Sequence, residues 1–219
     1  MVKKNNITAI IQARYSSTRL PGKILKKVGK YSILEILIKR LKTSKQKIDI
    51  IVACSDNKLD LKIIQLCKKL KVKYFVGSEK NVLQRFYLAA KKFNIDNIVR
   101  ITSDCPLIDI KTLDKLILKF LNTNSDYASN TLNPTYPDGM DLEIFKFKLL
   151  KERYFSKYQN EEREHVTTSM LFEDKYKKTE IKLQKDYSHL RLTLDDSYDF
   201  YILNKVIKYF KYNIYIDLN

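Results

Sequence analysis

The first candidate site of this 219-residue chain is a polar loop that follows an apolar, β-branched segment at residues 7–11. Within a dozen residues this loop carries three cations, Arg14, Arg19 and Lys23, together with three hydroxyl side chains and Gly22. Arginine forks match phosphate oxygens in pairs, lysine supplies a point charge, and backbone amides near a glycine can approach closely. The pattern therefore favours a phosphate-binding loop. An ordinary basic surface loop is the alternative that composition leaves open.

Acids follow two other apolar segments. Asp104 comes after residues 97–102, and Asp195 comes after residues 190–194. In an open α/β sheet, ligands bind outside the carboxyl ends of the strands, so these acids are expected to face the cationic loop. Mg²⁺ prefers hard oxygen ligands and usually takes one or two carboxylates plus phosphates and water. The pair therefore indicates a metal–polyphosphate site, whereas each acid alone could order a turn or cap a helix.

Several familiar kinds of site are excluded because the sequence lacks the patterns that mark them. Neither the Walker pattern G-x-x-x-x-G-K-[ST] nor the dinucleotide pattern G-x-G-x-x-G occurs. The three cysteines form no C-x-x-C pair, which argues against a zinc site or a disulfide framework and favours a reducing compartment. No apolar run approaches the roughly 18 residues of a membrane span, and the start of the chain lacks the pattern of a signal peptide. We expect a cytoplasmic protein with no membrane contact.

The net charge of +17 suggests nucleic acid as a partner, but the kind of basic residue argues against it. Only eight of the 42 basic residues are arginine, and the lysines are spread along every expected helix. Proteins that read base edges usually gather arginine in a patch. We interpret most of the charge as solvated lysine faces and expect no specific nucleic-acid partner.

The elements that must position these residues alternate between strand and helix patterns in the first half of the chain. Such an order predicts a mostly parallel sheet covered on both faces by helices, hence an α/β fold. The absence of an internal repeat or linker predicts a single domain over residues 1–219. The expected strands are residues 7–11, 48–53, 73–76 and 97–102, and the expected helices are one capped by Ser32 and those at residues 59–70, 81–93 and 112–121.

The pattern changes after Asp126. Two alternating segments flank a Pro/Gly turn at residues 135–139 and predict a hairpin excursion from the sheet. An exposed hairpin near residues 127–145 would suit a homodimer. The expected elements of this half are strands at 127–130, 141–145, 178–183 and 190–194, and helices at 148–172 and 197–210.

Residues 9–23 resemble the nucleotide-binding signature of the sugar-acid cytidylyltransferases, in particular the Kdo and spore-coat polysaccharide types. The resemblance covers essentially the whole chain and implies a Rossmann-like three-layer sandwich of the glycosyltransferase-A, or nucleotide-diphospho-sugar transferase, type. It also implies CTP as the donor and Mg²⁺ as the cofactor. Gln12 departs from the Pro of many sialate-type enzymes, and residues 15–17 replace their double-glycine turn, which puts CMP-sialate in doubt. Further segments similar to the spore-coat type are residues 51–56, 82–87, 100–109, 136–143, 163–167, 190–195 and 199–200.

By this resemblance, the first loop holds the triphosphate and the two acids hold magnesium. Asp104 and Asp195 are the expected metal ligands, and with Arg14 and Lys23 they are the expected catalytic residues. A second group of residues is expected near the base and ribose, although Ser78 could equally cap a helix and Arg85 could be a surface residue. The nucleotide-binding residues that the resemblance implies are Ala13, Arg14, Ser17, Arg19, Lys23, Ser55, Asp56, Ser78 and Arg85.

The acceptor is expected to lie against residues 138–143. Strand alternation puts Asp141 and Glu143 on one face, where paired carboxylates could bind sugar hydroxyls, or could merely keep a hairpin edge solvated. His165 is a further candidate as an acceptor contact or proton carrier. The expected substrate-binding residues are Asp138, Asp141, Glu143 and His165.

These expectations combine into metal-assisted nucleotidyl transfer, in which a hydroxyl of an acidic sugar attacks the α-phosphorus of CTP and expels pyrophosphate. The acid could be nonulosonic or Kdo-like, and the product would serve surface polysaccharide synthesis. One alternative is a glycosyltransferase of the same fold, which would need a D-x-D motif where this chain has Ser103-Asp104-Cys105. A basic binding protein without catalysis is the other, and its binding should fall steeply with salt.

Overall fold

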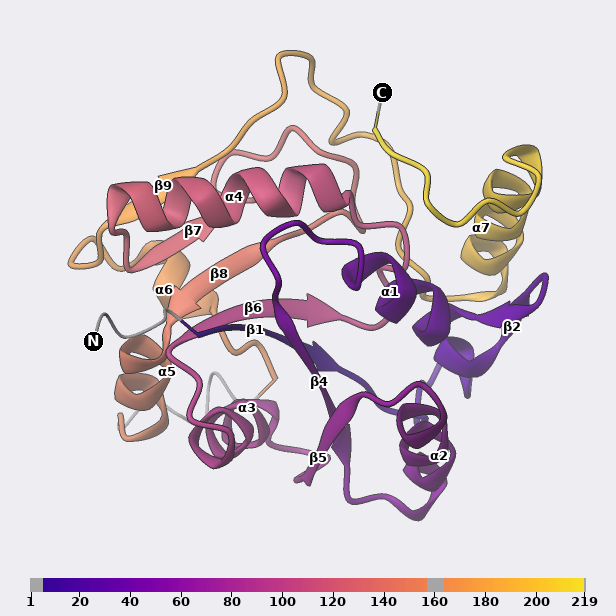
Figure 1. Ribbon diagram of the computed structural model, residues 1–219, viewed down its shortest axis with the longest axis horizontal. Helices are drawn as coiled ribbons and strands as arrows, with labels where there is room; N and C mark the ends of the chain where they lie inside the picture. The colour runs from indigo at the N-terminus through magenta and orange to yellow at the C-terminus, as the bar shows by residue number, and fades with distance from the viewer. Residues whose placement is uncertain (1–5, 157–163, 219) are drawn as a thin grey trace.

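The computed structural model describes residues 6–156 and 164–218 (Figure 1). Its centre is a seven-stranded sheet in the order β5-β4-β1-β6-β8-β7-β9, and a two-stranded ribbon, β2-β3, follows the first loop. The strands are β1 (Ile7–Gln12), β2 (Lys27–Val28), β3 (Tyr31–Ser32), β4 (Asp49–Ser55), β5 (Lys73–Gly77), β6 (Asn97–Thr102), β7 (Tyr127–Ser129), β8 (Glu143–Lys146) and β9 (Lys178–Glu180).

Seven α-helices and two short 3₁₀ turns are found in these residues. Their N-caps follow the residue types, since Ser32 accepts a hydrogen bond from the Glu35 amide and Asn81 accepts one from the Gln84 amide. The helices are α1 (Ile33–Leu41), α2 (Leu61–Lys69), α3 (Val82–Lys92), α4 (Ile110–Thr123), α5 (Phe147–Tyr154), α6 (Thr168–Phe172) and α7 (Ser197–Tyr209), and the 3₁₀ turns are η1 (Lys23–Leu25) and η2 (Lys58–Asp60).

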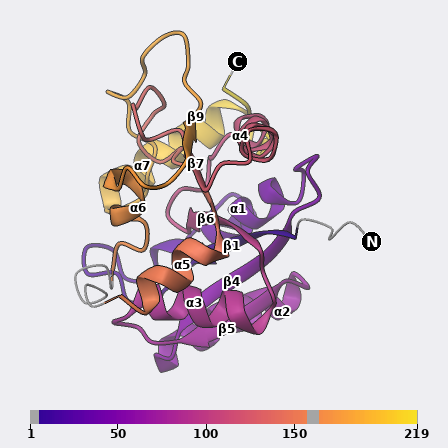
Figure 2. The ribbon, with the colours of Figure 1, turned by 90° about the vertical axis from the view of Figure 1, so that its left-hand side faces the viewer.

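The predicted α/β architecture is confirmed. Strands β5, β4, β1 and β6 run parallel, and β8 joins the far side of β6 in the antiparallel direction. Along β1, Ala9 and Ile11 pack into a core beneath α1, α2 and α4, whereas Ile10 packs into a second core beneath α3 and α5. Figure 2 shows α4 on one side of the sheet and α5 and α6 on the other. The chain is therefore a three-layer sandwich.

The hairpin is present, but the prediction that it is exposed is wrong. β8 lies between β6 and β7, and β9 adds outside β7, so neither hairpin strand is a sheet edge. All three residues of β7 are buried, as are the first three of β8. The argument for a homodimer through this hairpin therefore loses its basis.

Two other sequence-based elements differ from the structure. The expected helix at residues 148–172 is not continuous, because α5 ends at Tyr154, residues 164–167 are not helical and α6 begins at Thr168; residues 157–163 lie outside the described part. The expected strand at residues 190–194 is extended but forms only one bridge, between Arg191 and Asp138. It crosses from the Asp138 turn to the end of β6, where the Leu194 amide donates to the Asp104 carbonyl, instead of running along a neighbouring strand.

Within the described residues, no helix has both the length and the apolar character needed to cross a membrane.

Candidate active site

The loop after β1 is folded back on itself by backbone hydrogen bonds. The carbonyl oxygen of Tyr15 accepts from the Ser17 and Gly22 amides, both at 2.9 Å. Gly22 adopts φ of +68°, and a Cβ there would lie 2.9 Å from the Tyr15 ring, so the turn requires glycine. Lys23 then begins η1 and is directed toward the ends of the central strands.

A buried carboxylate ties this loop to the next strand end. Asp60 is fully buried; it accepts from the Tyr15 amide at 2.7 Å, and from the amide and the hydroxyl of Ser55, each also at 2.7 Å. The first loop is thus fixed relative to the end of β4. Sequence reasoning missed Asp60, although an acid at the start of a helix after a strand was the available signal.

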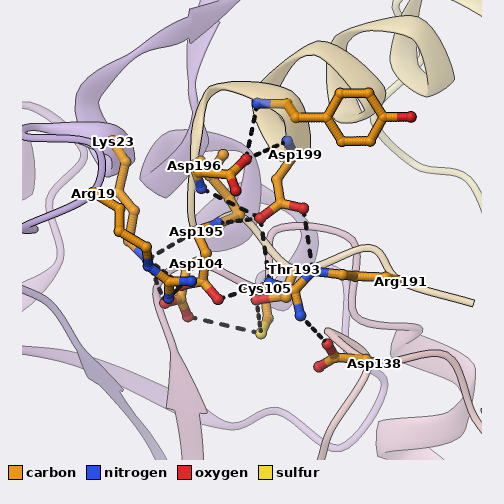
Figure 3. Close-up of polar contacts among 12 residues, drawn as sticks. Arg19, Lys23, Asp104, Cys105, Asp138, Arg191, Thr193, Asp195, Asp196 and Asp199 are labelled. Atoms are coloured by element: carbon orange, nitrogen blue, oxygen red, sulfur yellow. Dashed lines mark hydrogen bonds and ion pairs between the residues drawn. The ribbon is translucent and has the colours of Figure 1, made fainter.

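Lys23 brings the two distant aspartates together. Its Nζ lies 2.8 Å from Asp104 Oδ2 and 3.1 Å from Asp195 Oδ1, and it also donates to the Leu194 carbonyl at 2.7 Å (Figure 3). Arg19 adds a second cation 2.9 Å from Asp195 Oδ1. Residues separated by 172 positions along the chain therefore form one charge cluster at the carboxyl ends of the strands.

Asp195 is held in place by Arg191 and Asp199, two residues that the sequence analysis did not select for the site. Arg191 donates to Asp195 Oδ2 at 2.7 Å and to Asp199 at 3.1 Å, and it forms an ion pair with Asp138 at 2.5 Å. The Asp199 carboxylate in turn accepts from the Asp195 amide at 2.8 Å. The four-residue spacing of Arg191, Asp195 and Asp199 was the sequence signal for this network.

The alternative interpretation of Asp195 as the cap of the last helix is wrong. Asp196 occupies that position and accepts from the amides of Tyr198 and Asp199, which forms a capping box with the Asp199 side chain. Asp195 is therefore free to direct its carboxylate toward the loop. Burial opposes its ionisation, but hydrogen bonds from Lys23 and Arg191 outweigh this and hold the pKa of Asp195 below its usual value.

A cavity of about 420 Å³ opens beside this cluster. It is lined by all of the residues expected to bind the triphosphate and the metal, and by His165 of the expected acceptor group. It also contains Glu164, which forms an ion pair with Arg14 at 3.7 Å. The lining residues are Gln12, Arg14, Ser17, Thr18, Arg19, Lys23, Ile24, Arg100, Thr102, Ser103, Asp104, Glu164, His165 and Asp195.

The residues expected near the base and ribose lie beside this cavity but do not line it. Asp56 accepts from the Glu79 amide, and the Ser78 hydroxyl accepts from the Asn81 amide. Ser55 is buried against Asp60, and Ala13 is buried at the start of the first loop. Ser55, Asp56 and Ser78 thus lie at the ends of β4 and β5, whereas Ala13 lies at the end of β1.

Arg85 is a buried residue, so its alternative interpretation as a surface residue is wrong. Its Nη1 donates to the Ser78 carbonyl at 2.7 Å, whereas its Nε and Nη2 are buried without a hydrogen-bond partner. Burial lowers the pKa of this guanidinium, and the Asp60 charge partly offsets the effect. Two adjacent donors therefore remain unsatisfied beneath the β4 and β5 turns.

The residues expected on the acceptor side do not all lie in the cavity. Glu143 is buried: its Oε2 accepts from Arg100 at 2.6 Å and its Oε1 from the Tyr127 hydroxyl at 2.6 Å. Asp141 is exposed, and desolvation at this turn together with the nearby charges of Asp138 and Glu143 raises its pKa to about 6. Neither Asp141 nor Glu143 lines the cavity.

The Asp104–Asp195 pair has the donor chemistry that a magnesium ion requires. Both carboxylates approach the same Lys23 ammonium, which stands where a cation is favoured. In the described ranges no group of three or more His, Cys, Asp or Glu side chains is arranged to hold a metal. Two carboxylates suffice for an ion that completes its coordination with phosphate oxygens and water, so the residues fit Mg²⁺.

Comparison of the sequence with known proteins places these observations in a family context. A family model described as cytidylyltransferase matches residues 8–214. An uncharacterized protein of Methanocaldococcus jannaschii, MJ1063, is 42% identical over 209 residues, which cover 93% of this chain and 84% of that protein. The spore coat polysaccharide biosynthesis protein SpsF of Bacillus subtilis is 35% identical over 168 residues, covering 74% and 69% respectively.

The solved structures that resemble this chain also include a cytidylyltransferase. A cytidylyltransferase from Leptospira borgpetersenii serovar Hardjo-bovis superposes with a TM-score of 0.91 at 37% identity and covers 97% of this chain and 90% of its own. A CMP:2-keto-3-deoxy-manno-octonic acid synthetase complexed with CTP superposes with a TM-score of 0.65 at 12% identity, covering 93% and 99%. The second likeness establishes the fold alone, which is that of the nucleotide-diphospho-sugar transferases.

Proposed function

We propose a specific reaction for this chain, which belongs to the cytidylyltransferase family: the transfer of CMP from CTP to a hydroxyl of an acidic sugar. The chain is a cytidylyltransferase by family, and the proposal concerns the acceptor, the metal ion and the residues. The relationship to SpsF and the fold shared with a synthetase that acts on a sugar acid support a role in making an activated sugar for surface polysaccharide.

In the proposed reaction, the acceptor oxygen forms a bond to the α-phosphorus of CTP. The bond between that phosphorus and the oxygen bridging to the β-phosphorus breaks, and its electron pair leaves with pyrophosphate. The hydroxyl proton passes to solvent, so atoms and charges balance. The protein contributes position and charge compensation and forms no covalent bond with the substrate.

The cations of the first loop are proposed to bind the triphosphate. Arg14, Arg19 and Lys23 line one side of the cavity and can stabilise the charge that develops on departing pyrophosphate. Asp104 and Asp195 would hold Mg²⁺, which when bound polarises the phosphoryl oxygen and lowers the pKa of the attacking hydroxyl. In the free protein Lys23 is paired with both aspartates, so it would exchange them for phosphate oxygens as the substrate enters.

Cytosine recognition is proposed for Arg85, beneath the β4 and β5 turns. The unpartnered Nε and Nη2 form one edge of the guanidinium, and cytosine presents two adjacent acceptors, O2 and N3. Uracil carries a donor at N3, so the same edge would oppose it. Arg85 is buried in the free protein, so the neighbouring turns at Asp56 and Ser78 would have to open for the base to reach it.

We predict that Arg85→Lys weakens CTP binding at least tenfold and reduces the preference for CTP over UTP, because the lysine ammonium lacks the two-donor edge. Calorimetric titration of each nucleotide with Mg²⁺ would measure both effects. An unchanged CTP-to-UTP ratio in a folded variant would contradict the assignment to Arg85.

The observation that carries the proposed function is the convergence of Lys23, Arg19, Asp104 and Asp195 on one cavity. We predict that Asp104→Asn lowers kcat by about two orders of magnitude or more, the scale on which a misplaced charge-stabilising group costs activity. Pyrophosphate release from CTP with candidate acidic sugars would be the assay. Asp49→Asn is the matched control, because Asp49 is an exposed residue at the opposite end of β4 and pairs only with Lys73 at 3.7 Å among the ion pairs of the described residues.

Failure of the unmodified protein to bind CTP with Mg²⁺, or full activity of folded Asp104→Asn, would refute the proposed function.

A further inference from the structure

Exposed aromatic side chains gather on α7 and on the segment that follows it. Among the residues that the structure describes, six of the eight exposed aromatic side chains lie between positions 198 and 215, and the other two are Phe155 and Phe172. A concentration of apolar rings on one surface indicates a contact that the isolated chain does not make. The six side chains are Tyr198, Tyr201, Tyr209, Phe210, Tyr212 and Tyr215.

The helical period of α7 separates this surface from the core. Leu203 and Ile207 are buried and pack with Val28 of β2 in a third core cluster. The opposite face of the helix is exposed at positions three or four residues apart, which are neighbours on a helix surface. This exposed stripe consists of Tyr198, Tyr201, Lys205 and Lys208.

The stripe belongs to a larger surface that has lysines but no acids. Residues 200–216 contain three lysines and no Asp or Glu, and residues 26–31, which span the β2-β3 ribbon, contain three more lysines and no acid. Figure 1 shows β2 beside α7, and Lys26 Nζ lies 5.7 Å from the centroid of the Phe200 ring. All six lysines are exposed. The α7 surface is defined here as the six aromatic side chains together with Lys26, Lys27, Lys30, Lys205, Lys208 and Lys211.

A hollow of about 650 Å³ lies on the α7 surface. Its lining combines two ammonium groups with aromatic and aliphatic carbon. Such a combination matches a lipid phosphodiester, whose negative charge is joined to the start of an acyl chain. The lining residues are Lys205, Val206, Lys208, Tyr209 and Phe210.

Nucleic acid and a second copy of the chain fit this surface less well. Tyr201 already has two partners, because Tyr198 stacks on it with ring centroids 6.4 Å apart and Lys205 Nζ lies 5.3 Å from its centroid. Tyr209 and Phe210 meet edge to face at 5.3 Å. A platform for bases needs open ring faces, and the α7 surface also lacks arginine. A second copy would bring its own lysines against these, and like charges repel.

We propose that the α7 surface attaches the protein to a bilayer that carries anionic lipid headgroups. The lysines are attracted to the headgroup charge, while the tyrosine rings enter the interface and keep their hydroxyls in water. The attachment is peripheral and needs no segment that crosses the bilayer. The expectation of no membrane contact rested on the lack of such a segment, which this kind of binding does not require. No residue of the α7 surface lines the active-site cavity, so the inference does not depend on the proposed function.

Sedimentation with vesicles tests the binding. The full chain is mixed either with vesicles of phosphatidylglycerol and phosphatidylcholine in equal parts or with vesicles of phosphatidylcholine alone. We expect at least tenfold stronger binding to the anionic vesicles at low salt. This binding should be lost at about 1 M salt, where the Debye length is about 3 Å.

Two pairs of lysine variants separate the α7 surface from the general positive charge of the protein. Lys205→Gln with Lys208→Gln should weaken binding to the anionic vesicles at least tenfold. Lys68→Gln with Lys69→Gln is the matched control, because it removes the same charge from an exposed pair on α2. The control pair should change binding less than twofold.

A fluorescent reporter tests whether the rings of this surface enter the bilayer. The chain contains no tryptophan, so a single introduced indole reports on its own surroundings. The emission of Tyr209→Trp should shift to shorter wavelength when anionic vesicles are added, because the ring leaves water. Phe172→Trp is the control, since Phe172 is an exposed aromatic residue on α6, and its emission should not shift.

Absence of binding to the anionic vesicles, equal weakening by the two lysine pairs, or an emission of Tyr209→Trp that vesicles leave unchanged would overturn the inference. Tighter binding of a single-stranded oligonucleotide than of anionic vesicles, lost in Lys205→Gln with Lys208→Gln, would also overturn it and would assign the surface to nucleic acid.

Discussion

At the scale of single residues, the site is defined by the ion pairs that Lys23 forms with Asp104 and Asp195. Lys23 was expected from the sequence because it ends a cationic loop, and Asp104 and Asp195 because they follow strand-like segments; the structure brings all three within hydrogen-bond distance. The proximity follows from the parallel sheet, whose strand ends meet at one edge.

The charge of Asp141 gives a residue-scale prediction. Its pKa is raised to about 6 from an ordinary value of 3.8, so the folded protein holds the proton more tightly than the unfolded chain. This acid therefore lowers stability progressively as pH rises from about 4 through 6. We predict that Asp141→Asn melts at a higher temperature than the unmodified protein at pH 8, and that the difference shrinks toward pH 4.

Melting curves across this pH range would measure the effect. A difference between the Asp141→Asn and unmodified proteins that is constant from pH 4 to pH 8 would contradict the raised pKa.

Other site residues could not be predicted from single positions. Arg100 lies inside an apolar strand, and a charged residue there was a signal, but its pairing with Glu143 and Tyr127 depends on the antiparallel neighbour β8. Arg85 follows the helical pattern of α3 and gave no sign of being buried. In both cases, burial is set by elements distant in sequence.

At the scale of elements, the regular strand–helix order of residues 7–121 was predictable because each element carries its own periodicity. The later segment at residues 190–194 was not. Its alternation correctly indicates extended backbone, but strand pairing needs a neighbour, and this segment meets the Asp138 turn only at one bridge. Local pattern therefore predicts conformation better than it predicts pairing.

Gly139 provides the element-scale prediction. It adopts φ of +94°, and a Cβ there would lie 2.4 Å from the Thr193 amide nitrogen and 2.6 Å from the Leu192 carbonyl carbon. Gly139→Ala must move the backbone that leads to Asp195, and we expect a loss of roughly 2–4 kcal/mol in the free energy of unfolding, with lower kcat. Urea denaturation and the pyrophosphate assay would measure these.

The control for this variant is Gly29→Ala. Gly29 also has positive φ, +59°, but its added Cβ would meet only the Tyr212 ring among the nearest atoms, 2.9 Å away. We expect a smaller loss of stability and unchanged activity. A Gly139→Ala protein with unaltered kcat would show that the contact with residues 192–193 does not govern the position of Asp195.

At the scale of the whole molecule, charge is distributed in two distinct ways. The net charge of +17 arises mainly from lysines spread over the surface, whereas the cavity balances its cations against Asp104, Asp195 and Glu164. The fold therefore does not need a metal ion to neutralise this site in the free state.

A prediction about metal removal follows. The melting temperature should be the same in EDTA and in Mg²⁺ alone, because Lys23 already compensates both aspartates. CTP added with Mg²⁺ should raise it by several degrees, since a ligand that binds only the folded state stabilises that state. Lys23→Met provides the contrast, because Asp104 then loses its cation partner while Asp195 keeps Arg19 and Arg191, so Mg²⁺ alone should become stabilising. A markedly lower melting temperature of the unmodified protein in EDTA than in Mg²⁺ would contradict this account.

The contact between the Asp138 turn and residues 190–194 limits how the Asp138 turn can be exchanged between related enzymes. Through Arg191, the turn that leads into β8 is joined to the carboxylate of Asp195 and to the start of α7. Exchanging this turn alone would also displace the Asp195 carboxylate, because Arg191 contacts both Asp138 and Asp195. An engineer who transplants residues 138–141 from a relative should transplant residues 190–199 with them, as one inherited unit.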